Sequence, residues 1–144
     1  MEPYYGLNDA MVSLVFLAPL TGYLAAASLN STIHTTLGQR GVAIIGPSCQ
    51  IFHAIFLSTH PPFPVIVLSF SVLGFGTGLM DPAWCAWAGG LPNANTIQGF
   101  LHGSFSLGAT CGPFLATTLV AKVKLPWYTY YYIMVGLSAR THAP

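Results

Sequence analysis

The chain has 144 residues, of which 53% are hydrophobic and 5% are charged. Soluble domains carry about 25% charged residues, and a chain this short keeps too large a surface-to-volume ratio to hide so much apolar surface from water. The composition excludes an ordinary soluble domain and predicts an integral, multi-pass membrane protein, and the net charge of +1 gives no indication of a nucleic-acid partner.

Four apolar runs are long enough to cross a bilayer as helices, which takes about 20 residues each. The first follows a helix cap at Asn8 or Asp9 and ends in the short loop "HTTLGQRG", and the second stops at the prolines of "HPPFP". The turn "GGLPNANTIQG" separates the third from the fourth, which "KVKLP" closes. A fifth run is too short to span alone. The predicted spans are 10–33, 41–59, 64–90, 97–121 and a partial span at 127–139.

Helices are the expected structure of these runs, because an open chain in lipid must satisfy every backbone group internally. A barrel would need strands near ten residues long with alternating polarity, and these runs are longer and do not alternate. The sequence therefore predicts an all-α membrane bundle, with 1–144 as a single transmembrane domain, which the resemblance described below implies is partial. The N-terminus has no Lys or Arg before its first apolar run, so we expect no cleaved signal peptide.

One carboxylate stands alone in the middle of the chain. No Asp, Glu, Lys or Arg occurs from Gly41 to Met80 or from Pro82 to Ala121, so Asp81 is isolated in the third span. A carboxylate within a bilayer costs about 2.5–3.5 kcal/mol even on the lenient insertion scale, and such residues normally face a bundle interior or a water-filled cavity. Removal from water favours the neutral form, so this carboxyl group is a proton-carrying candidate. The alternative is a structural aspartate that bonds to a neighbouring helix.

The third span has two further features near Asp81. Pro82 leaves the carbonyl of Gly78 without its helical donor, which loosens the helix there. Trp84 and Trp87 fall on nearly the same side, so they either anchor the helix at the membrane interface or stack on a sugar ring.

The fourth span has a side of small residues, which lets two helix backbones approach closely. Its predicted packing residues are Gly99, Gly103, Ser104, Gly108, Gly112, Pro113 and Ala116. A bulky side of Phe100, Leu107 and Phe114, spaced by seven, is expected to face lipid.

A polar stripe with a period of four residues occupies the third side of this helix. It indicates either a polar solute pathway or hydrogen bonding between helices without a transport role. Its residues are Gln98, His102, Ser106 and Thr110.

Enzyme chemistry and cofactor sites find little support. "GFGTGL" lacks the third glycine, the preceding strand and the later acidic residue of a dinucleotide-binding loop. Cys49, Cys85 and Cys111 lie in apolar stretches without metal-ligand spacing and are expected to be small buried hydrophobes. The sequence has no clustered carboxylates, Ser–His pair or His-x-x-x-His motif. We therefore predict a protein that is not an enzyme and has no cofactor or metal.

The segment "GYLAAASLNSTIHTTLGQRG" resembles the inter-span motif of the major facilitator superfamily, through Gly22 and the cytoplasmic-loop residues Gly38, Arg40 and Gly41. The motif's acidic residue is absent here, where alanines occupy that region. "GFGTGLMDPAWCAW" with "GFLHGSFSLGATCGPFLAT" resembles the sugar–proton symporter branch of fucose permeases, and more closely a fungal group. In that branch a glycine-rich helix carries a membrane carboxylate, which Asp81 matches, and a following asparagine, which Cys85 replaces.

The resemblance also matches the small-residue stretch of the next helix with Gly108, Gly112 and Pro113, and places His102 at a polar pore-lining position. It implies that the chain covers spans two to six of a twelve-span symporter, with the Arg40 loop cytoplasmic and the remaining half as its partner. A small polar solute such as a sugar would then move with a proton, across the plasma membrane rather than an organelle membrane. The competing expectation is a non-transporting membrane fragment or accessory subunit that acts through helix packing.

Overall fold

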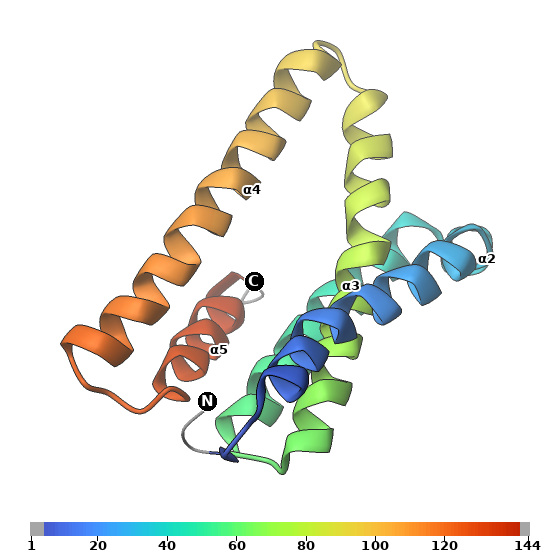
Figure 1. Ribbon diagram of the computed structural model, residues 1–144. Helices are drawn as coiled ribbons and strands as arrows, with labels where there is room; N and C mark the ends of the chain where they lie inside the picture. Colours follow the sequence, from blue (N-terminus) through green and yellow to red (C-terminus); the bar gives the residue numbers. More distant parts are fainter. Residues whose placement is uncertain (1–4, 142–144) are drawn as a thin grey trace.

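The computed structural model describes residues 5–141, with side chains described up to residue 136. Within this range the chain forms helices and no strand, which confirms the predicted all-α membrane fold (Figure 1). Three helical segments are long and apolar enough to cross a membrane, namely Asp9–Ser58, Phe63–Gly89 and Ala94–Lys122. The elements in chain order are α2 (Asp9–Ser58), α3 (Phe63–Gly89), α4 (Ala94–Thr117), the π-helix η1 (Thr118–Lys122) and α5 (Thr129–Thr141).

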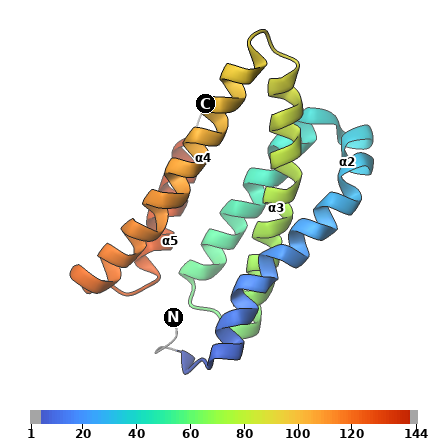
Figure 2. The same cartoon turned by 45° about the horizontal axis from the view of Figure 1, so that its top comes forward.

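Helix α2 contains the first two expected spans and the loop expected between them. The side chain of Asn8 caps its start by accepting a hydrogen bond from the backbone N–H of Met11 at 2.9 Å. Its backbone leaves helical geometry only at Gly38, where φ is 66° and ψ is −176°. A left-handed φ of this kind suits glycine, which has no Cβ to clash. The chain therefore folds back at one residue instead of through a longer loop, and α2 becomes a first arm (9–37) and a second arm (39–58) (Figures 1 and 2).

Helix α3 packs against both arms of α2, and alternating glycines permit the close approach. A Cβ added at Gly74 would overlap the backbone of Pro19, on the first arm. A Cβ at Gly76 would come within 2.7 Å of Cys49 Cβ and 2.8 Å of the Gly46 carbonyl oxygen, on the second arm. Residues two apart on a helix point to nearly opposite sides, since each residue turns the helix by about 100°. The glycine pattern therefore lets α3 touch a different arm on each side.

The tightest apolar packing lies where these three segments meet. Ala26 and Val42, one from each arm, join Leu79 and Ala83 of α3 in a cluster whose members are at most 2% exposed. Near the bend, the Gln39 side-chain amide donates to the Ala83 carbonyl at 3.0 Å, so the turn of α2 is tied to α3. The two arms and α3 form the packed part of the molecule.

Helix α4 leaves this packed part. It follows a tight turn in which Asn93 adopts a left-handed φ of 62°, and no residue of α4 is buried. Figure 1 shows α4 diverging from α3 below the turn. Helix α5 returns toward α2: the Tyr132 hydroxyl donates to the Ser58 carbonyl at 3.2 Å, and the ring of Tyr131 lies edge-on to the buried His53 at 5.9 Å. One side of α4 is therefore open along most of its length.

Candidate functional site

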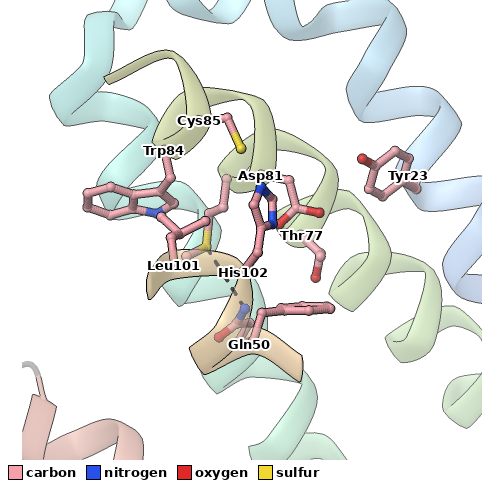
Figure 3. A pocket seen from close by; sticks show the side chains of 10 residues that line it. Tyr23, Gln50, Thr77, Asp81, Trp84, Cys85, Leu101 and His102 are labelled. Carbon is pink, nitrogen blue, oxygen red and sulfur yellow. Dashed lines mark hydrogen bonds between the residues drawn. The ribbon is translucent and has the colours of Figure 1, made fainter. Parts of the chain in front are cut away.

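A cavity of about 550 Å³ lies between α3, α4 and both arms of α2 (Figure 3). The first arm contributes one aromatic residue and the second arm one amide, while α3 and α4 contribute the rest. The cavity is lined by Tyr23, Gln50, Thr77, Met80, Asp81, Trp84, Cys85, Leu101, His102 and Phe105.

Helical periodicity explains why α3 presents its polar groups together. Thr77, Asp81 and Cys85 recur every four residues, which places them on one side of a helix. Glycines occupy the sides of α3 that touch the arms of α2, so the larger polar groups remain for the third side. Asp81 is half-buried and lies within α3, lining this cavity. The isolated carboxylate therefore faces this cavity.

His102 of α4 lies opposite Asp81. Both side chains line the cavity, an electrostatic interaction links them, and Figure 3 shows the imidazole beside the carboxyl group. A carboxyl group and an imidazole can both take part in hydrogen bonds to a polar ligand. One residue of the pair comes from α3 and the other from α4, so both helices contribute a titratable side chain to this site.

Several lining residues were not identified from the sequence. Thr77 could have been found, because it lies one helical turn before Asp81. Tyr23 and Gln50 come from the two arms of α2, and no local pattern marks them. In the structure the Gln50 amide lies 3.9 Å from the sulfur of Met80, its hydrogen-bond acceptor. Among the described residues, no group of three His, Cys, Asp or Glu side chains is arranged to hold a metal ion.

The four residues of the polar stripe of α4 do not share one environment. Only His102 lines the cavity, while Gln98 donates to the Cys85 carbonyl at 3.4 Å near the turn between α3 and α4. The hydroxyls of Ser106 and Thr110 each donate to the carbonyl four residues earlier on their own helix, at 2.9 Å. Ser106 was expected to share the cavity with Asp81, and the structure places it outside.

The two tryptophans also differ in their surroundings. Trp84 lines the cavity, whereas Trp87 does not line it and is 50% exposed. Their rings are nearly perpendicular, with centroids 5.9 Å apart. Of the two tryptophans, only Trp84 therefore belongs to the cavity wall.

Most of the small residues of α4 have no other helix packed against them. A Cβ added at Gly99, Gly103 or Gly108 would have no neighbour within 4 Å, and Ser104 is exposed. Gly112 is the exception, since a Cβ there would lie 3.4 Å from the Tyr130 hydroxyl of α5. Gly112, Pro113 and Ala116 line a second, largely apolar groove between α4 and α5.

The bulky side of α4 is strongly exposed, with Phe100 at 75%, Leu107 at 66% and Phe114 at 72%. Where a further helix packs against the small side of α4, we expect a membrane-soluble thiol label to modify a cysteine at 107 more strongly than cysteines at 108 or 112. The reason is that small residues at this spacing suit contact with another helix, whereas large apolar side chains suit lipid. Labelling of single-cysteine variants in a background without Cys49, Cys85 and Cys111 measures this. Stronger labelling at 108 and 112 than at 107 would contradict the assignment of faces.

The residues of the loop motif lie at the bend of α2. Gly38 has the left-handed φ, Arg40 is exposed, and a Cβ added at Gly41 would meet the Leu37 side chain. The motif therefore coincides with the reversal of the chain between the two arms.

Comparison with known proteins agrees with this architecture. The family model of the Major Facilitator Superfamily matches residues 1–140. The chain is 29% identical over 119 residues to "Bypass of stop codon protein 6" of Saccharomyces cerevisiae, an alignment that covers 81% of this chain and 24% of that protein. The chain thus spans about a quarter of the length of this relative, and no solved structure matches. The family model covers nearly the whole sequence, and the chain belongs to the Major Facilitator Superfamily.

Proposed function

We propose that this chain is part of a secondary transporter that moves a small polar solute across a membrane with a proton carried by Asp81. The observation that carries the proposal is the position of the isolated carboxylate in a cavity bounded by α3, α4 and both arms of α2. Substrate and ion sites of such transporters lie near the bilayer midplane between helical repeats. In this proposal the chain is part of one half of the transporter. The remaining helices would close the other side of the solute pathway.

The chemistry of the cavity supports a polar, ring-shaped solute such as a sugar. Gln50 and Thr77 offer neutral hydrogen-bonding groups, His102 offers an imidazole, and the rings of Trp84 and Phe105 offer flat apolar surfaces. A pocket of this kind combines apolar walls with a few polar groups that orient the ligand. Asp81 then serves as the proton carrier, since it can be neutral or charged while the uncharged groups hold the solute.

Replacing His102 with alanine should weaken solute binding. The loss of a hydrogen bond to a buried polar ligand is worth about 1–3 kcal/mol, which corresponds to roughly a 5- to 150-fold increase in Kd. Binding of a panel of radiolabelled sugars and polyols to the purified full-length transporter measures this. Thr110→Ala is the matched control, because Thr110 lies on the same helix outside the cavity. Equal affinities of wild type and His102→Ala for every bound solute would contradict a pathway through this cavity.

A second candidate is a membrane protein that acts by helix packing and does not transport. The specific observation in its favour is the open side of α4, where the glycines at 99, 103 and 108 have no neighbour within 4 Å of an added Cβ. The transcript around the coding sequence separates the two candidates. An in-frame continuation into further spans favours the transporter, and a stop codon after Pro144 favours the packing protein.

A further inference from the structure

Thr77 differs from the other polar side chains of the cavity in the hydrogen bonds that it can still make. Its hydroxyl donates to the Leu73 carbonyl, one helical turn earlier, at 3.0 Å. A hydroxyl has one proton and two lone pairs, so Thr77 can only accept a further hydrogen bond. We propose that Thr77 is a specificity-determining residue, which accepts a hydrogen bond from a hydroxyl of the solute and selects against solutes that lack this donor. This inference rests on the proposed function, because it takes the cavity as the solute site.

The position of Thr77 makes its oxygen available to a solute. The side chain is half-buried and lines the cavity, and Figure 3 shows it on the same side of α3 as Asp81. Among the residues that the structure describes, no donor is hydrogen-bonded to Thr77 Oγ1. Residues four apart on a helix have Cβ atoms about 5–6 Å apart, so a solute hydroxyl bound to Thr77 would lie next to the Asp81 carboxyl group.

The bond to the Leu73 carbonyl fixes the role of the Thr77 hydroxyl. Threonine commonly bonds to the carbonyl four residues earlier in a helix, and this bond gives its proton a partner where water is scarce. A solute group that can only accept would leave the Thr77 oxygen without a donor or would draw the proton away from Leu73. A hydroxyl group of the solute needs neither change, because it brings its own proton.

Three other neutral side chains of the cavity can take either role. Gln50 has amide donors and a carbonyl acceptor, and its bonded donor meets only the Met80 sulfur, a weak acceptor, at 3.9 Å. The neutral imidazole of His102 has one donor and one acceptor nitrogen, and the Tyr23 hydroxyl can donate or accept. These groups can adjust to a donor or an acceptor of the solute. The discrimination between the two is therefore expected at Thr77.

The experiment compares sugars with analogues in which one hydroxyl is replaced by fluorine, which is similar in size but cannot donate. The probes are D-glucose, D-galactose and their monofluorinated analogues, and equilibrium binding to the purified full-length transporter gives each Kd. We expect the wild type to bind at least one analogue at least about fivefold more weakly than its parent sugar. Thr77→Val keeps the shape of the side chain but removes the acceptor, so this ratio should fall to about 1. Thr77→Ser should keep the ratio, because serine can make the same bond to the helix.

Thr110→Val is the matched control. The Thr110 hydroxyl donates to the Ser106 carbonyl in the same way, at 2.9 Å, but lies outside the cavity, so every ratio should stay unchanged. A purely structural role of Thr77 would change the affinities for sugar and analogue alike and leave their ratio as it is. Thr77→Ala removes the same acceptor and gives a second measurement if Thr77→Val does not fold.

The outcomes separate this inference from the proposed function. Equal affinity of the wild type for each sugar and all its analogues would overturn the role of Thr77 and leave a sugar transporter standing. A ratio that persists without the Thr77 hydroxyl, or that is lost in Thr77→Ser, would overturn it in the same way. No binding of either sugar by the wild type would overturn the assignment of a sugar to this cavity and the inference with it.

Discussion

Asp81→Asn is expected to abolish uphill uptake in the full-length transporter. Asparagine keeps the size of the side chain and much of its hydrogen bonding but cannot carry a proton. Because proton movement would no longer be coupled to solute movement, we expect the ratio of internal to external solute concentration to fall to its equilibrium value of about 1. Solute binding and counterflow exchange should remain largely intact, since neither needs net proton movement. Uptake into proteoliposomes with an imposed pH gradient, beside counterflow without one, measures both.

The control for this variant is Asp9→Asn. Asp9 lies exposed at the start of α2 and does not line the cavity, so its replacement should leave uptake unchanged. Accumulation by Asp81→Asn with the wild-type dependence on external pH would refute the proton role. Loss of binding together with loss of uptake would point instead to a structural aspartate.

Alanine at Gly22 or Gly74 is expected to destabilise the packed part of the chain strongly. A Cβ at Gly22 would overlap the Ser71 carbonyl oxygen and lie 2.7 Å from the Phe75 nitrogen, and one at Gly74 would overlap the backbone of Pro19. These neighbours are backbone atoms, which cannot move aside as a flexible side chain can. Overpacking of this kind costs about 1–3 kcal/mol, so each variant should lose about that much free energy of unfolding.

Gly108→Ala and Gly103→Ala are the matched controls, because a Cβ at either position meets nothing within 4 Å. In an exposed helix, replacing glycine with alanine stabilises by up to about 1 kcal/mol, so the controls should change stability in the opposite direction. Equilibrium unfolding of the 144-residue chain in mixed micelles, followed by circular dichroism, measures all four variants. Equal effects at the two pairs of positions would show that α3 does not pack against α2 as the structure has it.

The sequence by itself determined that the chain lies in a lipid bilayer and that it is helical. It also identified one candidate functional residue. Uncharged runs longer than 20 residues can be stable only where water is absent, and there the backbone must bond to itself, so helices follow. Asp81 was identifiable for the same reason, since a carboxylate among apolar residues is costly enough to need a specific environment. Thr77 follows from the helical period as well, because it lies one turn before Asp81 on the same side of the helix.

The sequence could not show which helix faces which. The stripe of His102, Ser106 and Thr110 is regular, yet of these three only His102 lines the cavity, while the neighbouring Leu101 and Phe105 also line it. The spacing of residues determines the sides of a helix, but the angle to its neighbour comes from packing elsewhere.

The tertiary structure alone decided how the cavity is enclosed. Gly38 reverses α2 at a single residue, and this reversal brings Tyr23 and Gln50, 27 positions apart in the sequence, to the same cavity. The glycines of α3 then allow each arm to approach to backbone contact. Contacts between distant positions depend on the shape of both surfaces at once, whereas a sequence pattern describes only one surface at a time.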